Sequence, residues 1–133
     1  MKWDIVPSND ELALLMEAGF IYRDARQFQE AAEVFAGVRA LLPQSEVPEV
    51  ALGTVRFHQA DFDGATKHYN KALEVNGRSA YAHAHLGEVY LFQKDKDKAR
   101  QHLKKALELD PRGEFGKMAR SLLEFADVVQ FTN

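Results

Sequence analysis

The sequence has no cysteine, only four prolines and no long apolar run. Without cysteine there is no disulfide and no thiolate-bound metal, which fits a cytoplasmic protein. No stretch approaches the roughly 18 apolar residues of a membrane-spanning helix, and Met1–Pro7 does not have the pattern of a secretory signal. The formal net charge of -3 gives no general attraction to nucleic acid or an anionic membrane. We therefore expect a cytoplasmic protein with neither of these as its partner.

The length of 133 residues leaves room for one hydrophobic core. Hydrophobic residues make up 46% of the chain and charged residues 28%, a balance that favours a folded chain over a disordered one. We therefore expect a single domain over residues 1–133.

Similar residues recur at intervals of 34 along the chain, at four positions of the repeat. A repeat of this length, without insertion or deletion, predicts a stack of similar units rather than one layered core. The recurring positions hold Gly19, Gly53 and Gly87; Ala31, Ala65 and Ala99; Phe35, Tyr69 and Leu103; and Pro43, Gly77 and Pro111.

Each unit has the pattern of two antiparallel helices. Ala99, Leu103 and Ala106 are four and three residues apart, so they share one helical face, and Pro111 cannot continue the helix that carries them. The glycine of each unit lies on the first helix, where it lets the second helix approach closely. The predicted helices span roughly residues 10–25 and 28–42, 46–59 and 62–76, and 80–93 and 96–109.

Start signals precede two of these helices. Ser8, Asn9 and Asp10 offer a cap for the first helix. Ser45 is the expected cap of the third helix, because Pro48 is tolerated in a first helical turn.

In this pattern the chain resembles the tetratricopeptide-repeat (TPR) family over about residues 12–111. The resemblance implies an all-α fold, a right-handed superhelix of three helix-turn-helix hairpins. The three repeats would lie at about 12–45, 46–79 and 80–113.

Four residues depart from the family pattern. Ala18 and Val38 differ in size from the residues usual at their positions, and Glu49 and Arg56 stand where the family places apolar or aromatic residues. We expect these departures to weaken the packing of the middle repeat without disturbing the regular spacing.

A seventh helix is predicted from about Glu114 to Gln130, within a C-terminal segment of about 114–131. Its apolar residues fall on one broad arc, so we expect a capping helix that covers the exposed face of the last repeat. A dedicated binding helix is the alternative, and Val128 and Phe131 lie off the arc. The arc holds Phe115, Met118, Ala119, Leu122, Leu123, Phe125, Ala126 and Val129.

The sequence shows no catalytic constellation. His83 and His85 point about 200° apart on one helix, and neither His58 nor His68 has an acidic residue at a ligand-like spacing. There is no phosphate-binding glycine loop, zinc-protease motif or nucleophile elbow. The run Lys94–Lys98 alternates in sign and indicates a solvated surface. We expect no enzyme, no cofactor and no metal.

In the TPR family the first helix of each repeat lines a concave groove, at the second, fifth, ninth and twelfth positions of the repeat. The resemblance implies a peptide-binding groove at the matching residues of this chain. They are Ala13, Met16, Phe20 and Arg23 in the first repeat, Val47, Val50, Thr54 and Phe57 in the second, and Tyr81, Ala84, Glu88 and Leu91 in the third.

One subtype of the family clamps the C-terminal carboxylate of heat-shock proteins with Lys and Asn residues in this lining. A carboxylate needs charged or amide donors to replace its water, and only His85 offers one here. The resemblance therefore does not extend to the clamp, whose positions hold Met16, Phe20, Ala51, Tyr81 and His85.

The implied lining is instead apolar, with methionine and aromatic residues prominent. Exposing a side chain such as Phe57 forgoes roughly 1.5–3 kcal/mol of burial, and a contiguous exposed patch of this kind marks a binding site. We expect the groove to take an apolar strand or an amphipathic helix of a client protein. Two alternatives stay open: tight winding buries part of the lining, or Met1–Pro7 fills the groove with Trp3 and Ile5.

The chain is also similar to the small TPR chaperones of bacterial type III secretion, in its three repeats, extra helix and apolar groove. The segment Glu33–Ser45, followed by Pro48, resembles that group. The resemblance implies a cytoplasmic chaperone or adaptor that holds an aggregation-prone translocator or needle subunit before export. By the same analogy, we expect a homodimer formed through the first repeat or the capping helix. The alternative is a structural scaffold, in which the apolar surface is a permanent subunit interface.

Overall fold

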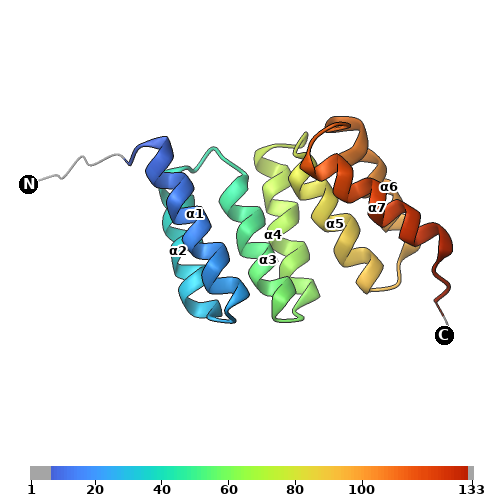
Figure 1. The fold of residues 1–133 in the computed structure, drawn as a ribbon, viewed down its shortest axis with the longest axis horizontal. Helices are drawn as coiled ribbons and strands as arrows, with labels where there is room; N and C mark the ends of the chain where they lie inside the picture. Colours follow the sequence, from blue (N-terminus) through green and yellow to red (C-terminus); the bar gives the residue numbers. More distant parts are fainter. Residues whose placement is uncertain (1–6, 132–133) are drawn as a thin grey trace, which may run out of the picture.

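The computed structural model describes residues 7–131, and within that range the chain forms seven helices and no strand. The helices stack side by side as antiparallel hairpins, from α1 at one end to α7 at the other (Figure 1). Each helix begins and ends within two residues of its predicted bounds. The helices are α1 (Asn9–Asp24), α2 (Phe28–Leu41), α3 (Val47–His58), α4 (Phe62–Val75), α5 (Ala80–Phe92), α6 (Lys96–Leu109) and α7 (Glu114–Val128).

The start of α1 follows the predicted cap, and the start of α3 does not. Ser8 caps α1, since its hydroxyl accepts a hydrogen bond from the backbone N–H of Glu11 at 3.2 Å in a reciprocal capping box. The N-cap of α3 is Glu46, whose side chain makes no capping bond, so the prediction of Ser45 as the cap was wrong by one residue. The Ser45 hydroxyl still accepts a hydrogen bond from the N–H of Val47 at 3.2 Å.

The three turns between paired helices have the same geometry. Arg26, Ala60 and Lys94 occupy the same position in successive repeats, and their φ angles are 64°, 60° and 63°. In the first turn the N–H of Gln27 donates to the Tyr22 carbonyl at 2.8 Å, and equivalent bonds of 2.9 Å close the other two turns. This pattern is a Schellman motif, which ends each first helix at the same repeat position.

The core forms where each glycine of a first helix meets a large side chain of the second. A Cβ atom on Gly53 would lie 2.3 Å from the Tyr69 ring. Gly19 meets Phe35 and Gly87 meets Leu103 in the same way, at 2.4 Å. The alanines of the repeat are fully buried beside these contacts, at Ala31, Ala65 and Ala99.

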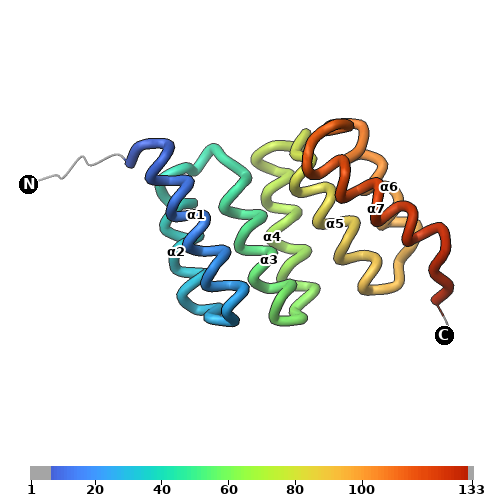
Figure 2. The backbone as a smooth tube through the Cα atoms, in the orientation of Figure 1, coloured from blue at the N-terminus to red at the C-terminus, as the bar shows by residue number. Residues whose placement is uncertain are grey.

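Packing joins each hairpin to the next along the stack (Figure 2). Helix α2 contacts α3, α4 contacts α5, and α7 packs on both α5 and α6. Ala119 and Ala126 of α7 are fully buried in this last contact. The structure thus has the all-α superhelix of three hairpins and a capping helix that the spacing predicts.

The predicted apolar arc of α7 needs two corrections. Phe125 remains 51% exposed, because the arc is wider than the surface that α5 and α6 offer. Phe131, which the arc left out, packs against the α5–α7 cluster. Trp3 and Ile5 lie outside the described residues, so the alternative that they fill the groove stays untested.

Replacing Gly53 with alanine tests the glycine contact. We expect Gly53→Ala to lower the free energy of unfolding by about 1–3 kcal/mol, because the added methyl group overlaps the buried Tyr69 ring. Gly37→Ala is the matched control: a Cβ there has no neighbour within 4 Å, so helix propensity should raise stability by about 0.5–1 kcal/mol. Urea unfolding followed by circular dichroism measures both changes. A Gly53→Ala protein as stable as the wild type would show that the close contact between Gly53 and Tyr69 does not limit packing.

Candidate functional site

The concave side of the stack contains a hollow of about 670 Å³. Helix α1 forms one wall, α5 and the start of α7 form the other, and α3 contributes a single residue between them. The curvature of the stack brings these separate segments to face one another. The lining residues are Met16, Phe20, Arg23, Val47, Tyr81, His85, Glu88, Glu114, Phe115 and Met118.

The structure brings six of the twelve predicted groove residues together around this hollow: Met16, Phe20, Arg23, Val47, Tyr81 and Glu88. Four others are buried, so the expectation that their side chains are exposed is corrected: Val50, Thr54, Ala84 and Leu91. Of the other two, Ala13 is exposed but does not line the hollow, and Phe57 is partly buried and packs edge-on against Phe92 with ring centroids 4.9 Å apart.

Burial of the middle lining has a simple cause. Helix α3 lies between α1 and α5 and contacts both of them, so neighbouring side chains cover its concave face. Val50 has no exposed surface and Thr54 only 2%. Val47, in the first turn of α3, escapes this cover and remains 38% exposed. The alternative that winding buries part of the lining therefore applies to the middle repeat.

Helix α7 supplies three lining residues that the sequence analysis missed: Glu114, Phe115 and Met118. A signal for two of them was present, because Phe115 and Met118 stand one repeat length after Tyr81 and Ala84. Helix α7 thus occupies the place of the first helix of a fourth repeat. The Phe115 ring stacks on the Tyr81 ring with centroids 4.6 Å apart and an interplanar angle of 23°. Capping and lining are combined in one helix.

Arg23 is held in place at one end of the hollow. Its guanidinium donates to the Thr54 hydroxyl at 2.9 Å and pairs with Asp24 at 2.9 Å. The same group lies over the Phe20 ring, 4.9 Å from the centroid, a favourable cation–π arrangement. Because an aromatic face and two hydrogen-bonding partners already satisfy it, Arg23 contributes little net positive charge to a ligand.

The opposite wall combines aromatic rings with carboxylates. His85 lies 3.3 Å from the Glu88 carboxylate, and its ring meets Tyr81 edge-on at 5.1 Å. Burial raises the pKa of Tyr81, although nearby Arg23 acts in the opposite direction, so the phenol stays protonated at neutral pH. Glu88 and Glu114 thus give this wall a negative charge beside an apolar surface.

A second, smaller hollow of about 260 Å³ lies between the end of α5 and α7. Leu91, Leu122 and Phe131 are among its lining residues. Phe92 and Phe125, which also line it, are 60% and 51% exposed, and Val128 near the end of α7 is 78% exposed. We call the exposed residues Phe92, Phe125 and Val128 the end patch.

The histidines of the second and third repeats make contacts inside the stack. The Nδ1 atoms of His83 and His102 lie 3.0 Å apart, and burial lowers the pKa of both imidazoles. In the second repeat the equivalent pair is Glu49 and His68, joined at 2.8 Å. Each of these contacts joins the two helices of one repeat. The sequence analysis missed the Glu49–His68 pair because the two residues are on different helices.

Glu49 is a buried charge with two partners. Arg39 pairs with its second oxygen at 3.1 Å, and the carboxylate is 8% exposed. Burial by itself would raise the pKa of Glu49, but the hydrogen bonds from His68 and Arg39 outweigh it and hold the pKa below its usual value. The departure from the family pattern at Glu49 is thus compensated by neighbouring helices.

Residues 7–131 contain no group of three or more His, Cys, Asp or Glu side chains arranged to hold a metal ion. None of the helices α1 to α7 is both long enough and apolar enough to cross a membrane.

The sequence model of the tetratricopeptide repeat matches residues 44–112, more than half of the chain. The protein therefore belongs to the tetratricopeptide-repeat family, whose domains are in general modules for protein interaction. None of the curated proteins compared with the sequence matches it.

Several solved TPR structures have a similar fold. SycD, a type III secretion chaperone of Yersinia enterocolitica in complex with a YopD translocator peptide, has a TM-score of 0.72 and 22% identity over 91% of this chain and 95% of that one. PcrH in complex with the chaperone-binding region of PopD has a TM-score of 0.72 and 20% identity, over 94% of this chain and 97% of PcrH. The first TPR of Spaghetti (RPAP3), bound to an HSP90 peptide, has a TM-score of 0.72 and 20% identity, over 92% of this chain and 95% of that one. At these identities the similarity shows the fold alone.

The stability supplied by Glu49 should depend on pH. Its carboxylate ionises at about 4.5 when unpaired and at a lower pH in the fold, so the contribution is full above that value and is lost as pH falls through the folded pKa. Near pH 7 we expect Glu49→Gln to lower the free energy of unfolding by about 1–3 kcal/mol. The difference in free energy of unfolding between Glu49→Gln and the wild type should become smaller below pH 4.5.

Urea unfolding across this pH range measures this difference. Glu74→Gln serves as the control, since Glu74 is exposed and has no hydrogen-bond partner among residues 7–131. Its effect should stay within about 0.5 kcal/mol at every pH. A difference for Glu49→Gln that stays constant on acidification contradicts the assigned role.

Proposed function

We propose that this protein is a non-catalytic chaperone or adaptor whose concave groove binds an apolar or amphipathic segment of a client protein. The observation that carries the proposal is the hollow of about 670 Å³, with apolar side chains on facing walls. A volume of this size accepts several side chains of a partner segment. Methionines at two positions, Met16 and Met118, let the walls adapt to the segment that binds.

The charges of the groove favour a particular kind of segment. Glu88 and Glu114 lie beside the apolar wall, whereas Arg23 is paired with Asp24. A segment that carries a Lys or Arg next to its apolar residues would place a positive charge opposite these carboxylates. An acidic C-terminal tail would meet repulsion there, and Met16 and Phe20 stand where a carboxylate clamp needs donors.

Within this class we favour a cytoplasmic chaperone of the type III secretion kind. SycD in complex with a YopD peptide and PcrH in complex with the chaperone-binding region of PopD cover almost the same length as this chain. The HSP90-bound neighbour has the same fold, but its ligand requires a chemistry that the present lining does not offer. The similarity of length and the apolar lining together support the chaperone subclass.

The groove proposal is tested with a charge placed on its one exposed α3 residue. We expect Val47→Glu to abolish capture of the client from a host lysate and to weaken the purified interaction at least about tenfold, because an unpaired carboxylate would be buried against an apolar segment. Val75→Glu is the matched control, since Val75 is 46% exposed and lies outside the hollow.

Mass spectrometry identifies the client, and calorimetry with its purified segment measures affinity. Circular dichroism checks that both variants keep the helical content of the wild type. Equal capture by the wild type and a folded Val47→Glu protein would show that the concave groove is not the site.

A structural scaffold or homo-oligomer is the second candidate, and the end patch favours it. Three large apolar side chains are exposed at one end of the stack, and two of them, Phe92 and Phe125, line an apolar hollow. Such a surface would be covered if two copies packed end against end. In that arrangement the concave groove remains available for a client.

Sedimentation separates this candidate from a monomeric adaptor. If the end patch is an interface, the wild type should dimerise at micromolar concentration, and Phe125→Asp should remain monomeric at the same concentration. Val75→Asp provides the control, because Val75 is 46% exposed on α4 and lies outside the end patch. A wild type that sediments as a monomer throughout removes the scaffold interpretation.

A further inference from the structure

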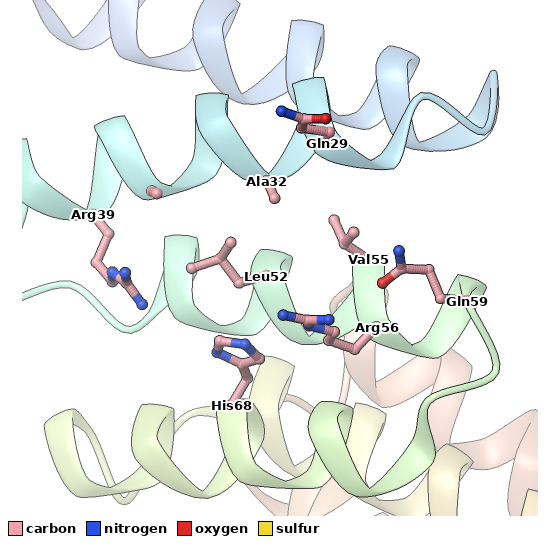
Figure 3. Close-up of a pocket in the computed structure, with 9 residues that line it drawn as sticks. Gln29, Ala32, Arg39, Leu52, Val55, Arg56, Gln59 and His68 are labelled. Carbon is pink, nitrogen blue, oxygen red and sulfur yellow. The ribbon is translucent and has the colours of Figure 1, made fainter.

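A pocket of about 360 Å³ opens on the convex side of the stack, away from the groove. Helices α2 and α4 form its sides and α3 forms its floor (Figure 3). Arg39, Arg56 and His68 come from these three helices, and their side chains point into the same space. The other lining residues are Gln29, Ala32, Ala36, Leu52, Val55 and Gln59.

The pocket exists because of substitutions in the middle of the repeat pattern. Arg56 occupies the repeat position that Tyr90 holds in the next unit, and Arg39 occupies that of Leu73. In the third repeat the Tyr90 ring stacks on His102, with centroids 5.6 Å apart and an interplanar angle of 22°. Leu73 and Tyr90 thus border the space between α4, α5 and α6, whereas the guanidinium groups of Arg39 and Arg56 border the equivalent space between α2, α3 and α4.

The charged side chains around the pocket differ in how many hydrogen-bond partners they have. Glu49, buried next to the pocket, accepts hydrogen bonds from Arg39 at 3.1 Å and from His68 at 2.8 Å. Arg56 makes no side-chain hydrogen bond to any of residues 7–131, and its nearest acid, Asp61, is 3.9 Å away. The guanidinium of Arg56 is therefore available to a ligand, as are the donors of Arg39 that Glu49 does not use.

We propose that this convex pocket binds a single carboxylate attached to a short aliphatic body. A guanidinium presents paired N–H donors that match the two oxygens of a carboxylate. Ala32 and Ala36 on one side and Leu52 on the floor give the pocket an apolar surface, and its volume lies at the lower end of the range for small ligands. The neighbouring Glu49 carboxylate opposes a second negative charge, which disfavours phosphates and dicarboxylates.

The convex pocket is separate from the concave groove and goes beyond the proposed function. Its lining residues and those of the groove have no member in common. Only α3 contributes to both sites, with Val47 on the concave side and Arg56 on the convex side. Failure of one proposal therefore leaves the other standing.

The first experiment is a nuclear magnetic resonance titration of the full chain with sodium hexanoate, compared with hexanamide. Hexanamide has the same aliphatic body without the charge. We expect saturable shifts of the Arg56 side-chain N–H and of the Ala32 and Ala36 methyl groups, with a dissociation constant of about 1 mM. Hexanamide should bind at least about tenfold more weakly, because it cannot form the charged hydrogen bonds.

Substitution of Arg56 tests the location. Arg56→Tyr restores the residue type of the third repeat, so the fold should hold while the shifts with hexanoate disappear. Arg56→Gln removes the charge without filling the pocket, and it should weaken binding at least about tenfold. Arg112→Gln, an equal change of charge at an exposed residue outside the pocket, should bind hexanoate as the wild type does.

Blocked dipeptides distinguish the two sources of such a carboxylate. Tighter binding of N-acetyl-Leu-Glu-amide than of hexanoate, with no binding of the Leu-Gln analogue, supports an acidic side chain of a partner. Binding of hexanoate without the dipeptide supports a free acid. Absence of saturable shifts with both, equal binding of hexanamide, or unchanged binding to a folded Arg56→Tyr protein overturns the proposal.

Discussion

The close approach of paired helices at Gly19, Gly53 and Gly87 is the constraint on which the remaining geometry depends. A side chain at any of these positions would overlap a buried ring or leucine of the second helix. Each hairpin therefore has nearly the same shape, and identical units stack with a constant rotation. That rotation curves the array and brings α1 opposite α5 and α7, so the concave hollow is a consequence of three small residues.

Sequence spacing predicted the parts of the fold that depend on local steric rules. Glycines, buried alanines and turn residues recur at the same place in every unit, because each unit must solve the same packing problem. The lining of the groove was less predictable. Repeat position states which way Val50 and Thr54 point, but their depth depends on how closely α1 and α5 flank α3. The contribution of α7 was predictable in principle, since Phe115 continues the spacing of Tyr81.

The middle repeat shows what spacing cannot predict. Glu49 and Arg56 are both charged residues at positions where the family places apolar or aromatic ones, yet their surroundings in the structure differ. Glu49 is buried and paired with residues from α2 and α4, 10 and 19 positions away in sequence. Arg56 stays half exposed beside a pocket. Which charge is compensated depends on contacts between helices, and no rule based on one helix contains that information.

Unequal burial along the stack has a mechanical consequence. Among the 16 residues of α1 only Gly19 is buried, although this helix forms one whole wall of the concave hollow. The free energy needed to displace a segment follows the apolar surface that the segment keeps from water. Helix α1 has fewer buried residues than any of α2 to α7, so we expect the width of the groove to change more easily than the spacing of the other helices. A bound segment that contacts both α1 and α5 would bury more of the apolar surface of α1. Binding would therefore stabilise the end of the solenoid that has the fewest buried residues.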